Sequence, residues 1–118
     1  MMNYCEKFMK NIELIKTFAL GGKAEAGNDR EAREIYRGAR RQLLEIKLRN
    51  GAILPKHKTG EPITVFCLAG NGTFRAGHDL EDAQKMTPGT LVTLEANVEH
   101  EAVAERELHL LVTKFKGN

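Results

Sequence analysis

The clearest pattern along this chain is the alternation of apolar and polar residues over residues 42–50. Leu44, Ile46 and Leu48 are each followed or preceded by a charged side chain. Because successive side chains of a β-strand point to opposite faces, this alternation predicts a strand with one buried face. The pair Asn50-Gly51 comes next, and it is suited to the positive φ angles of a tight turn.

More strands are predicted downstream, each bounded by turn residues. The first covers residues 62–69 and ends at Gly70-Asn71-Gly72, and a short return strand follows at 73–75. Another covers residues 90–95 after the Pro88-Gly89 turn, and the last covers residues 107–115. No helix of crossover length separates them, which argues against a parallel α/β sheet. The pattern favours an antiparallel sandwich or barrel.

The N-terminal part has a different pattern. Apolar residues recur at helical spacing over residues 4–20 and Gly21-Gly22 would end such a helix, although a short strand over residues 12–18 is an alternative. Residues 22–33 are polar and contain glycine, so they predict a loop. We therefore divide the chain into an N-terminal extension, residues 1–33, and a barrel domain, residues 34–118.

Length and charge narrow the function classes. The chain has 118 residues, which suits one domain, and its 18 basic and 16 acidic residues leave a net charge of +2. This balance does not suggest a nucleic-acid partner, because nucleic-acid binders usually carry a basic stripe. No apolar stretch approaches the ~20 residues of a membrane span, and no secretory signal is visible, so we expect no membrane partner and a cytoplasmic protein.

The two cysteines do not form a disulfide framework. Cys5 and Cys67 stand far apart and match no metal-ligand spacing with each other, so two independent reduced thiols are expected. Cys67 lies in the middle of the predicted strand at residues 62–69. A free cysteine at such a position is typically a small buried hydrophobic residue.

Two segments together carry a family resemblance. Gly51 stands six positions before His57, and Gly70 stands thirteen positions after it; in the second segment Pro88-Gly89 precedes a strand and a loop that ends in His100. These spacings resemble the two motifs of the cupin superfamily, and most closely its small single-domain, RmlC-like members. The resemblance implies an all-β fold, the antiparallel β-barrel known as the jelly roll or double-stranded β-helix. It also implies a homodimer.

The sequence departs from the metal-binding form of the first motif. That form has a second histidine and a glutamate, and here those positions hold Thr59 and Ile63. Of the four usual ligands only His57 and His100 remain.

Strand parity suggests a replacement ligand. If the pairing continues without a bulge near Gly60, Thr59 and Glu61 share the inward face with His57. His57, His100 and Glu61 would then form a set of two histidines and one carboxylate for a divalent transition metal, such as Fe, Mn, Zn, Ni or Cu.

The other histidines are expected away from this site. His78 lies in a turn-like stretch and is expected to be exposed, and His109 alternates against the apolar residues of the last strand, so it is expected to point outward. Phe66, Leu68 and Phe74 are expected on the outer face of the sheet, where an apolar surface would suit the homodimer.

Three functions are consistent with these residues. The first is the binding of a small molecule in the barrel, oriented by His57, Thr59, Glu61, Cys67 and His100. The second is a metal-dependent enzyme of the dioxygenase or isomerase type that uses the same two histidines. The third is a structural or regulatory dimeric module, which predicts a filled barrel without a cavity near His57. The missing motif ligands favour the first.

Overall fold

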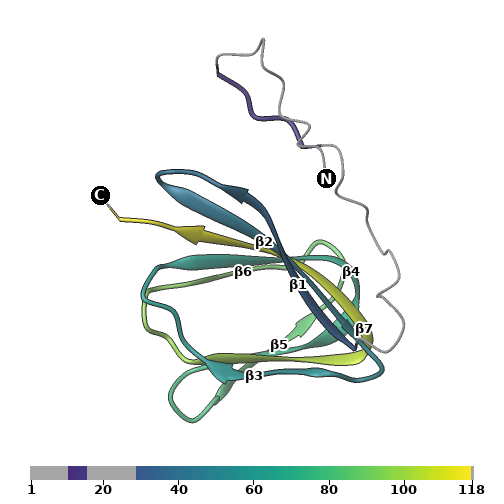
Figure 1. Cartoon of the computed structure of the whole chain (residues 1–118). Coiled ribbons are helices and arrows are strands. Elements are labelled where there is room, and N and C mark those ends of the chain that lie inside the picture. The colour runs from purple at the N-terminus through teal and green to yellow at the C-terminus, as the bar shows by residue number, and fades with distance from the viewer. Residues whose placement is uncertain (1–10, 16–28, 118) are drawn as a thin grey trace.

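The computed structural model describes residues 11–15 and 29–117, and the described residues form one antiparallel sheet folded into a barrel (Figure 1). The strands are β1 (Arg30–Arg37), β2 (Arg41–Arg49), β3 (Ile53–His57), β4 (Ile63–Ala76), β5 (Asp82–Met86), β6 (Leu91–Leu94) and β7 (His100–Phe115). The all-β jelly-roll fold expected from the sequence is confirmed.

The sheet makes two layers because its two longest strands belong to both. The C-terminal part of β7 pairs with β2 and with the first half of β4, and β1 and β6 extend this layer. The N-terminal part of β7 pairs with β3 and with the second half of β4, which also pairs with β5. Figure 1 shows β7 bending from one layer into the other. The apolar core lies between the layers.

A bulge in β4 changes which residues face this core. Cys67 pairs with Leu110 and Ala69 pairs with His109, so Leu68 is an extra residue with no partner on β7. Because the side-chain period of a strand is two, one extra residue reverses the inward face. Val65 and Cys67 are buried before the bulge, and Phe74 is buried after it.

This reversal corrects the prediction that Phe74 lies on the outer face with Phe66. Phe74 is 3% exposed and belongs to the core, while Phe66 and Leu68 are half-buried. The prediction placed a turn at Gly70-Asn71-Gly72 and could not place the bulge at Leu68. The homodimer itself stays a prediction.

The layers meet where the backbones of β4 and β7 come very close. Gly70 has a φ of 84°, and a Cβ at this position would overlap the carbonyl oxygen of Glu107. A Cβ at Gly72 would overlap the carbonyl oxygen of Val103. Only glycine permits this approach, which gives a physical reason for the glycine that closes the first motif.

Two predicted turns are present. Asn50 and Gly51 have φ angles of 55° and 71°, the combination that a type I′ hairpin turn requires. Pro88-Gly89 forms a turn in which the Thr90 amide donates to the Thr87 carbonyl at 2.9 Å, and Gly89 has a φ of 95°. Both turns match the residues chosen from the sequence.

Several strand assignments were wrong or incomplete. The predicted return strand at residues 73–75 is the second half of β4, because the strand continues through Gly70-Asn71-Gly72 instead of turning there. The strand that returns along β4 is β5, which the sequence did not reveal, and β1 and β3 were also missed. β7 begins at His100, well before the predicted residue 107.

The N-terminal predictions fall mostly outside the described residues. Within the predicted helix over residues 4–20, or strand over 12–18, only residues 11–15 are described, and they form neither element. β1 begins at Arg30, before the predicted domain boundary at residue 34. Within residues 11–15 and 29–117, no helix is long and apolar enough to cross a membrane.

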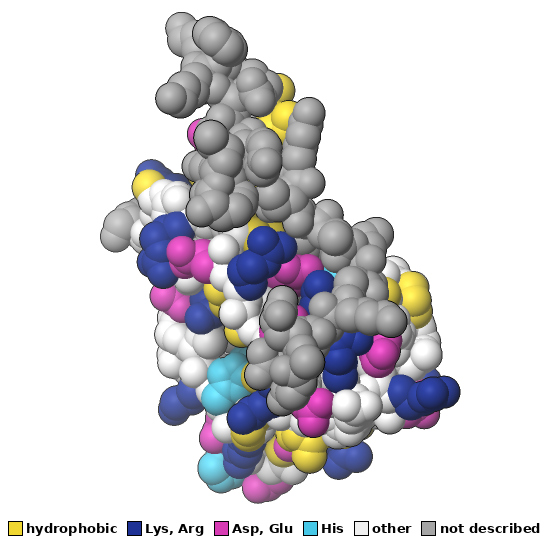
Figure 2. Space-filling model, turned by 45° about the vertical axis from the view of Figure 1, so that its right-hand side comes forward, with side chains coloured by type: hydrophobic (Ala, Val, Ile, Leu, Met, Phe, Trp, Pro, Cys, Tyr) yellow, Lys and Arg dark blue, Asp and Glu magenta, His cyan; other side chains and the backbone are white. Residues whose placement is uncertain are grey.

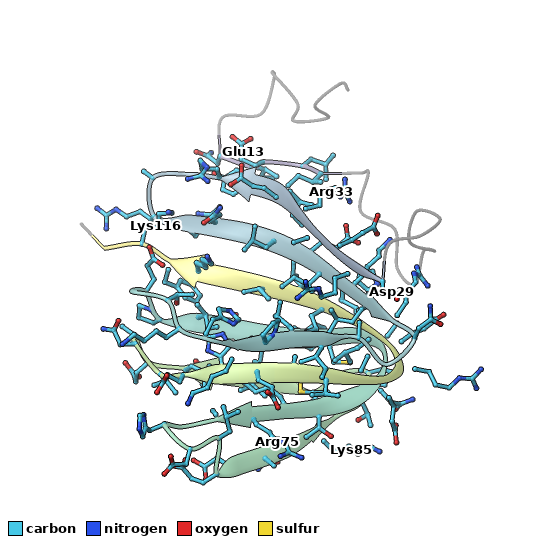
Figure 3. The ribbon with its side chains drawn as sticks, turned by 60° about the horizontal axis from the view of Figure 1, so that its bottom comes forward. Glu13, Asp29, Arg33, Arg75, Lys85 and Lys116 are labelled. Atoms are coloured by element: carbon cyan, nitrogen blue, oxygen red, sulfur yellow. The ribbon has the colours of Figure 1, made fainter. Side chains whose placement is uncertain are left out.

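An ionic cluster on the outer face of the sheet links β1 to β2 and β7. Glu45 accepts hydrogen bonds from Arg33, labelled on β1 in Figure 3, at 2.7 Å and 3.0 Å, and from His109 at 2.7 Å. Burial raises the pKa of Glu45, but these hydrogen bonds outweigh it and hold the pKa below its ordinary value. His109 thus lies on the expected outer face, yet this cluster keeps it 4% exposed.

We expect Gly70→Ala to lower the free energy of unfolding by roughly 2–4 kcal/mol, because it adds both a disfavoured φ and a backbone overlap. Gly89→Ala is the matched control, since Gly89 also has a positive φ but no atom lies within 4 Å of the point that an added Cβ would occupy. The control should cost about 1–2 kcal/mol. Urea unfolding measures both, and equal losses would contradict the proposed close approach.

Candidate ligand-binding site

Two histidines meet at the edge of the second layer. His57 ends β3 and His100 begins β7, and the two are direct cross-strand partners. Their ring centroids lie 4.3 Å apart with the rings inclined at 61°. Phe74 of β4 stacks on the other side of His100, with centroids 5.6 Å apart. The pairing of β3 with β7 therefore brings together the histidines of the two sequence motifs.

Backbone carbonyls fix the tautomers of both rings. The Nδ1 atom of His57 lies 2.8 Å from the Pro55 carbonyl oxygen, and the Nδ1 atom of His100 lies 2.9 Å from the Val98 carbonyl oxygen. A carbonyl oxygen only accepts hydrogen bonds, so each Nδ1 carries a proton and donates it. In the neutral rings the Nε2 atoms are therefore left with lone pairs that can accept hydrogen bonds from a ligand.

The surroundings of His100 favour its neutral form. Burial lowers the pKa of His100, the hydrogen bond to Val98 opposes this, and the electrostatic effects of His57 and Lys114 lower the pKa further. Glu99 and Glu101 flank His100 in the chain but do not contribute to this balance. Glu99 instead accepts a hydrogen bond from His78 at 2.8 Å.

The two histidines border a cavity of about 90 Å³ between the sheet layers. Its walls are mainly apolar side chains of β2, β3, β4 and β7, among them Ile46, Val65 and Leu110. The polar side chains that line it are those of His57, Thr59, His100 and Lys114. The cavity is smaller than the ~300–1,000 Å³ of pockets for drug-sized ligands, so an occupant must be compact.

Thr59 has a fixed orientation at this cavity. It follows β3, and its hydroxyl donates a hydrogen bond to the Glu61 carbonyl oxygen at 2.8 Å. The predicted position of Thr59 beside His57 and His100 is therefore supported by the cavity lining.

Lys114 is the polar side chain of this cavity that was not predicted from the sequence. It lies near the end of β7, opposite Ile63 of β4, on the same face as Leu110 and Val112. The bend of β7 brings both ends of the strand to one cavity, which explains how Lys114 acts on His100. The signal in the sequence was the alternation of the last strand, in which a lysine takes the next inward position after Val112.

Glu61 and Cys67 do not line the cavity. The parity that placed Glu61 beside His57 assumed one continuous strand, but β3 ends at His57 and β4 begins at Ile63. Cys67 is fully buried deeper in the core, where burial raises the pKa of its thiol. It behaves as the small hydrophobic residue that its position in the strand suggested.

The donor set does not fit the transition metal of the second hypothesis. Within residues 11–15 and 29–117, no three side chains of His, Cys, Asp or Glu are placed to hold a metal ion together. His57 and His100 are adjacent, but Glu61 is not brought to them, and two imidazoles alone fall short of the ligand sets that iron or zinc sites use. The expected set of His57, His100 and Glu61 is not assembled.

The remaining histidine has no part in the cavity. The side chain of His78 is 85% exposed, as expected, and lies with Lys56 around the carboxylate of Glu99. On the face shown in Figure 2, basic and acidic side chains are interspersed over the surface.

Solved structures of other proteins have the same fold as this chain. An RmlC-like cupin protein from Desulfovibrio desulfuricans is similar with a TM-score of 0.75 and 15% identity, over 87% of this chain and 97% of that one. A cupin superfamily protein from Desulfitobacterium hafniense has a TM-score of 0.71 and 10% identity, over 80% of this chain and 84% of that one. No protein-family model and no curated protein matches the sequence.

The described residues therefore define a small β-barrel domain with a histidine-bordered cavity. This chain has the cupin fold, in the form of the small RmlC-like proteins. At these identities the likeness establishes the fold, and the chemistry has to be argued from the residues of the cavity.

We expect stability to fall as the pH drops below about 6.5. The pKa values of His100 and His109 are lowered in the folded chain, so the unfolded chain takes up these protons at a higher pH than the folded one. Well above the ordinary histidine pKa neither state takes up these protons, so the two histidines do not affect stability. As the pH falls through that pKa, the unfolded chain binds the protons first and the fold is destabilised. Urea unfolding at about pH 7.5 and about pH 5.5 measures this loss.

The matched variants assign part of this loss to His100. His100→Phe keeps an aromatic ring against Phe74 and should reduce the difference in stability between the two pH values. His78→Gln replaces an exposed histidine that pairs with Glu99 outside the cavity, and it should change this difference less than His100→Phe does. An unaltered difference in His100→Phe would contradict the burial of a neutral imidazole.

Proposed function

We propose that this chain binds one compact, largely apolar small molecule in the cavity between its sheet layers, without catalysing a reaction on it. The observation that carries this proposal is the open cavity of about 90 Å³ bordered by His57 and His100. An apolar pocket with a few placed polar groups is the usual form of a small-molecule site. A cavity at His57 also favours ligand binding over the interaction module, which predicts a filled barrel.

The polar groups suit orientation of a ligand better than catalysis. In the neutral tautomer with the proton on Nδ1, the Nε2 atoms of His57 and His100 supply hydrogen-bond acceptors, while the apolar walls supply most of the contact area. A metal-dependent reaction is not proposed, because the third protein ligand that it needs does not reach the two histidines. The ligand gains its binding energy from apolar burial and its orientation from the histidines.

A homodimer stays an expectation beside this function. On the outer face, Phe66 is the cross-strand partner of Leu91 and of Leu111. Leu91 is 61% exposed. These are the apolar side chains that we propose a second copy of the chain would cover.

Binding is tested by titrating labelled protein with compact organic fragments and following the amide and imidazole signals by NMR. Fragments that bind should shift the signals of His57, Thr59 and His100 together. Thr59→Trp puts a large ring on the lining of the cavity and should abolish these shifts. Lys58→Trp changes the neighbouring residue, which does not line the cavity, and should preserve them.

The proposal fails if no fragment shifts the histidine signals of the folded wild-type protein. It also fails if Thr59→Trp and Lys58→Trp, both shown to be folded by their thermal melts, bind the same fragments equally well. In that case the fragments occupy another surface.

A further inference from the structure

The charged group of the cavity is a lysine. Lys114 lines the cavity on the layer that faces the histidine pair, and no carboxylate side chain lines it. The positive charge of Lys114 lies near enough to His100 to lower the pKa of that histidine. Through the described part of the chain, no ion pair includes Lys114.

An inward lysine is costly unless something compensates its charge. Lys114 is half-buried, and the apolar walls beside it solvate an ammonium group poorly. Glu99, next to His100 in the chain, contacts His78 and Lys56, and Glu45 contacts Arg33 and His109 on the outer face. The cavity therefore has a positive charge that a ligand anion would neutralise.

From this charge, and resting on the proposed small-molecule function, we infer that the ligand is a small carboxylate with a compact apolar body. The carboxylate accepts a charge-assisted hydrogen bond from the Lys114 ammonium, and the apolar body contacts the walls of the cavity. A hydroxyl group on the ligand would donate to a free histidine Nε2 atom, which is an acceptor in the neutral tautomer. The ligand class is thus set by one cation and two acceptors in an apolar space.

Three probes of nearly equal size separate these contributions. Isobutyrate carries the carboxylate, isobutyramide is its neutral isostere, and 2-hydroxyisobutyrate adds a hydroxyl donor. We expect the wild-type protein to bind isobutyrate about tenfold more tightly than isobutyramide, as a charge-assisted hydrogen bond predicts. The hydroxylated probe should bind more tightly than isobutyrate. NMR titration of the histidine and Thr59 signals gives the dissociation constants.

Lysine variants identify the group responsible. Lys114→Met replaces the ammonium with an apolar end of similar length and should weaken isobutyrate binding about tenfold while changing isobutyramide binding by less than about twofold. Lys114→Gln, a neutral polar variant, should behave the same way. Lys116→Met is the control, because Lys116, labelled in Figure 3, does not line the cavity. It should leave both affinities unchanged.

The outcomes separate this inference from the function on which it rests. Equal affinities for isobutyrate and isobutyramide, or an isobutyrate affinity that survives Lys114→Met, would overturn the carboxylate assignment and leave small-molecule binding in place. If none of the three probes and no neutral fragment binds the folded protein, both the assignment and the proposed function are wrong.

Discussion

The close approach of β4 and β7 is the constraint on which the rest of the structure depends. At Gly70 and Gly72 the two backbones come so near that a side chain on either residue would overlap the β7 backbone. Next to this contact, the Leu68 bulge reverses the inward face of β4. Together they turn one sheet into two layers, and bulges and glycines are the usual means by which sheets make such corners.

The cavity is a consequence of this corner. Because β7 passes from one layer to the other, His100 at its start and Lys114 near its end face the same space. Because the inward face of β4 is reversed, Phe74 lies inside the barrel and stacks on His100. Without the bulge, the parity of β4 would put Phe74 on the outer face and leave one side of the imidazole without its aromatic contact.

Sequence reasoning succeeded where a local rule determines the outcome. Asn50-Gly51 and Pro88-Gly89 formed turns because their φ requirements are local, and the spacing of His57, Gly70 and His100 indicated the fold. Sequence reasoning failed where the pairing between strands distant in the sequence determines which way a side chain faces. The position of Phe74 depends on a bulge against β7, and Glu61 stayed away from the cavity because the chain leaves the sheet between β3 and β4.

The same distinction explains the site. The alternation of β7 gave an inward position to Lys114, but only the closed barrel shows that this position faces His100. The sequence motifs lack two of the usual metal ligands, yet they still allowed a metal site with Glu61 as the replacement ligand. The structure argues against that site because Glu61 lies apart from the two histidines. What remains is a pair of imidazoles whose carbonyl partners determine the chemistry they offer.

The most direct test of this account is a long-range ¹H–¹⁵N NMR spectrum of the histidine side chains at about pH 8, where imidazoles are ordinarily neutral. The account predicts that His57 and His100 both carry the proton on Nδ1 and have unprotonated Nε2 atoms, because each Nδ1 donates to a backbone carbonyl. Protonated Nε2 atoms on both rings would contradict it, since the cavity would then offer hydrogen-bond donors instead of acceptors.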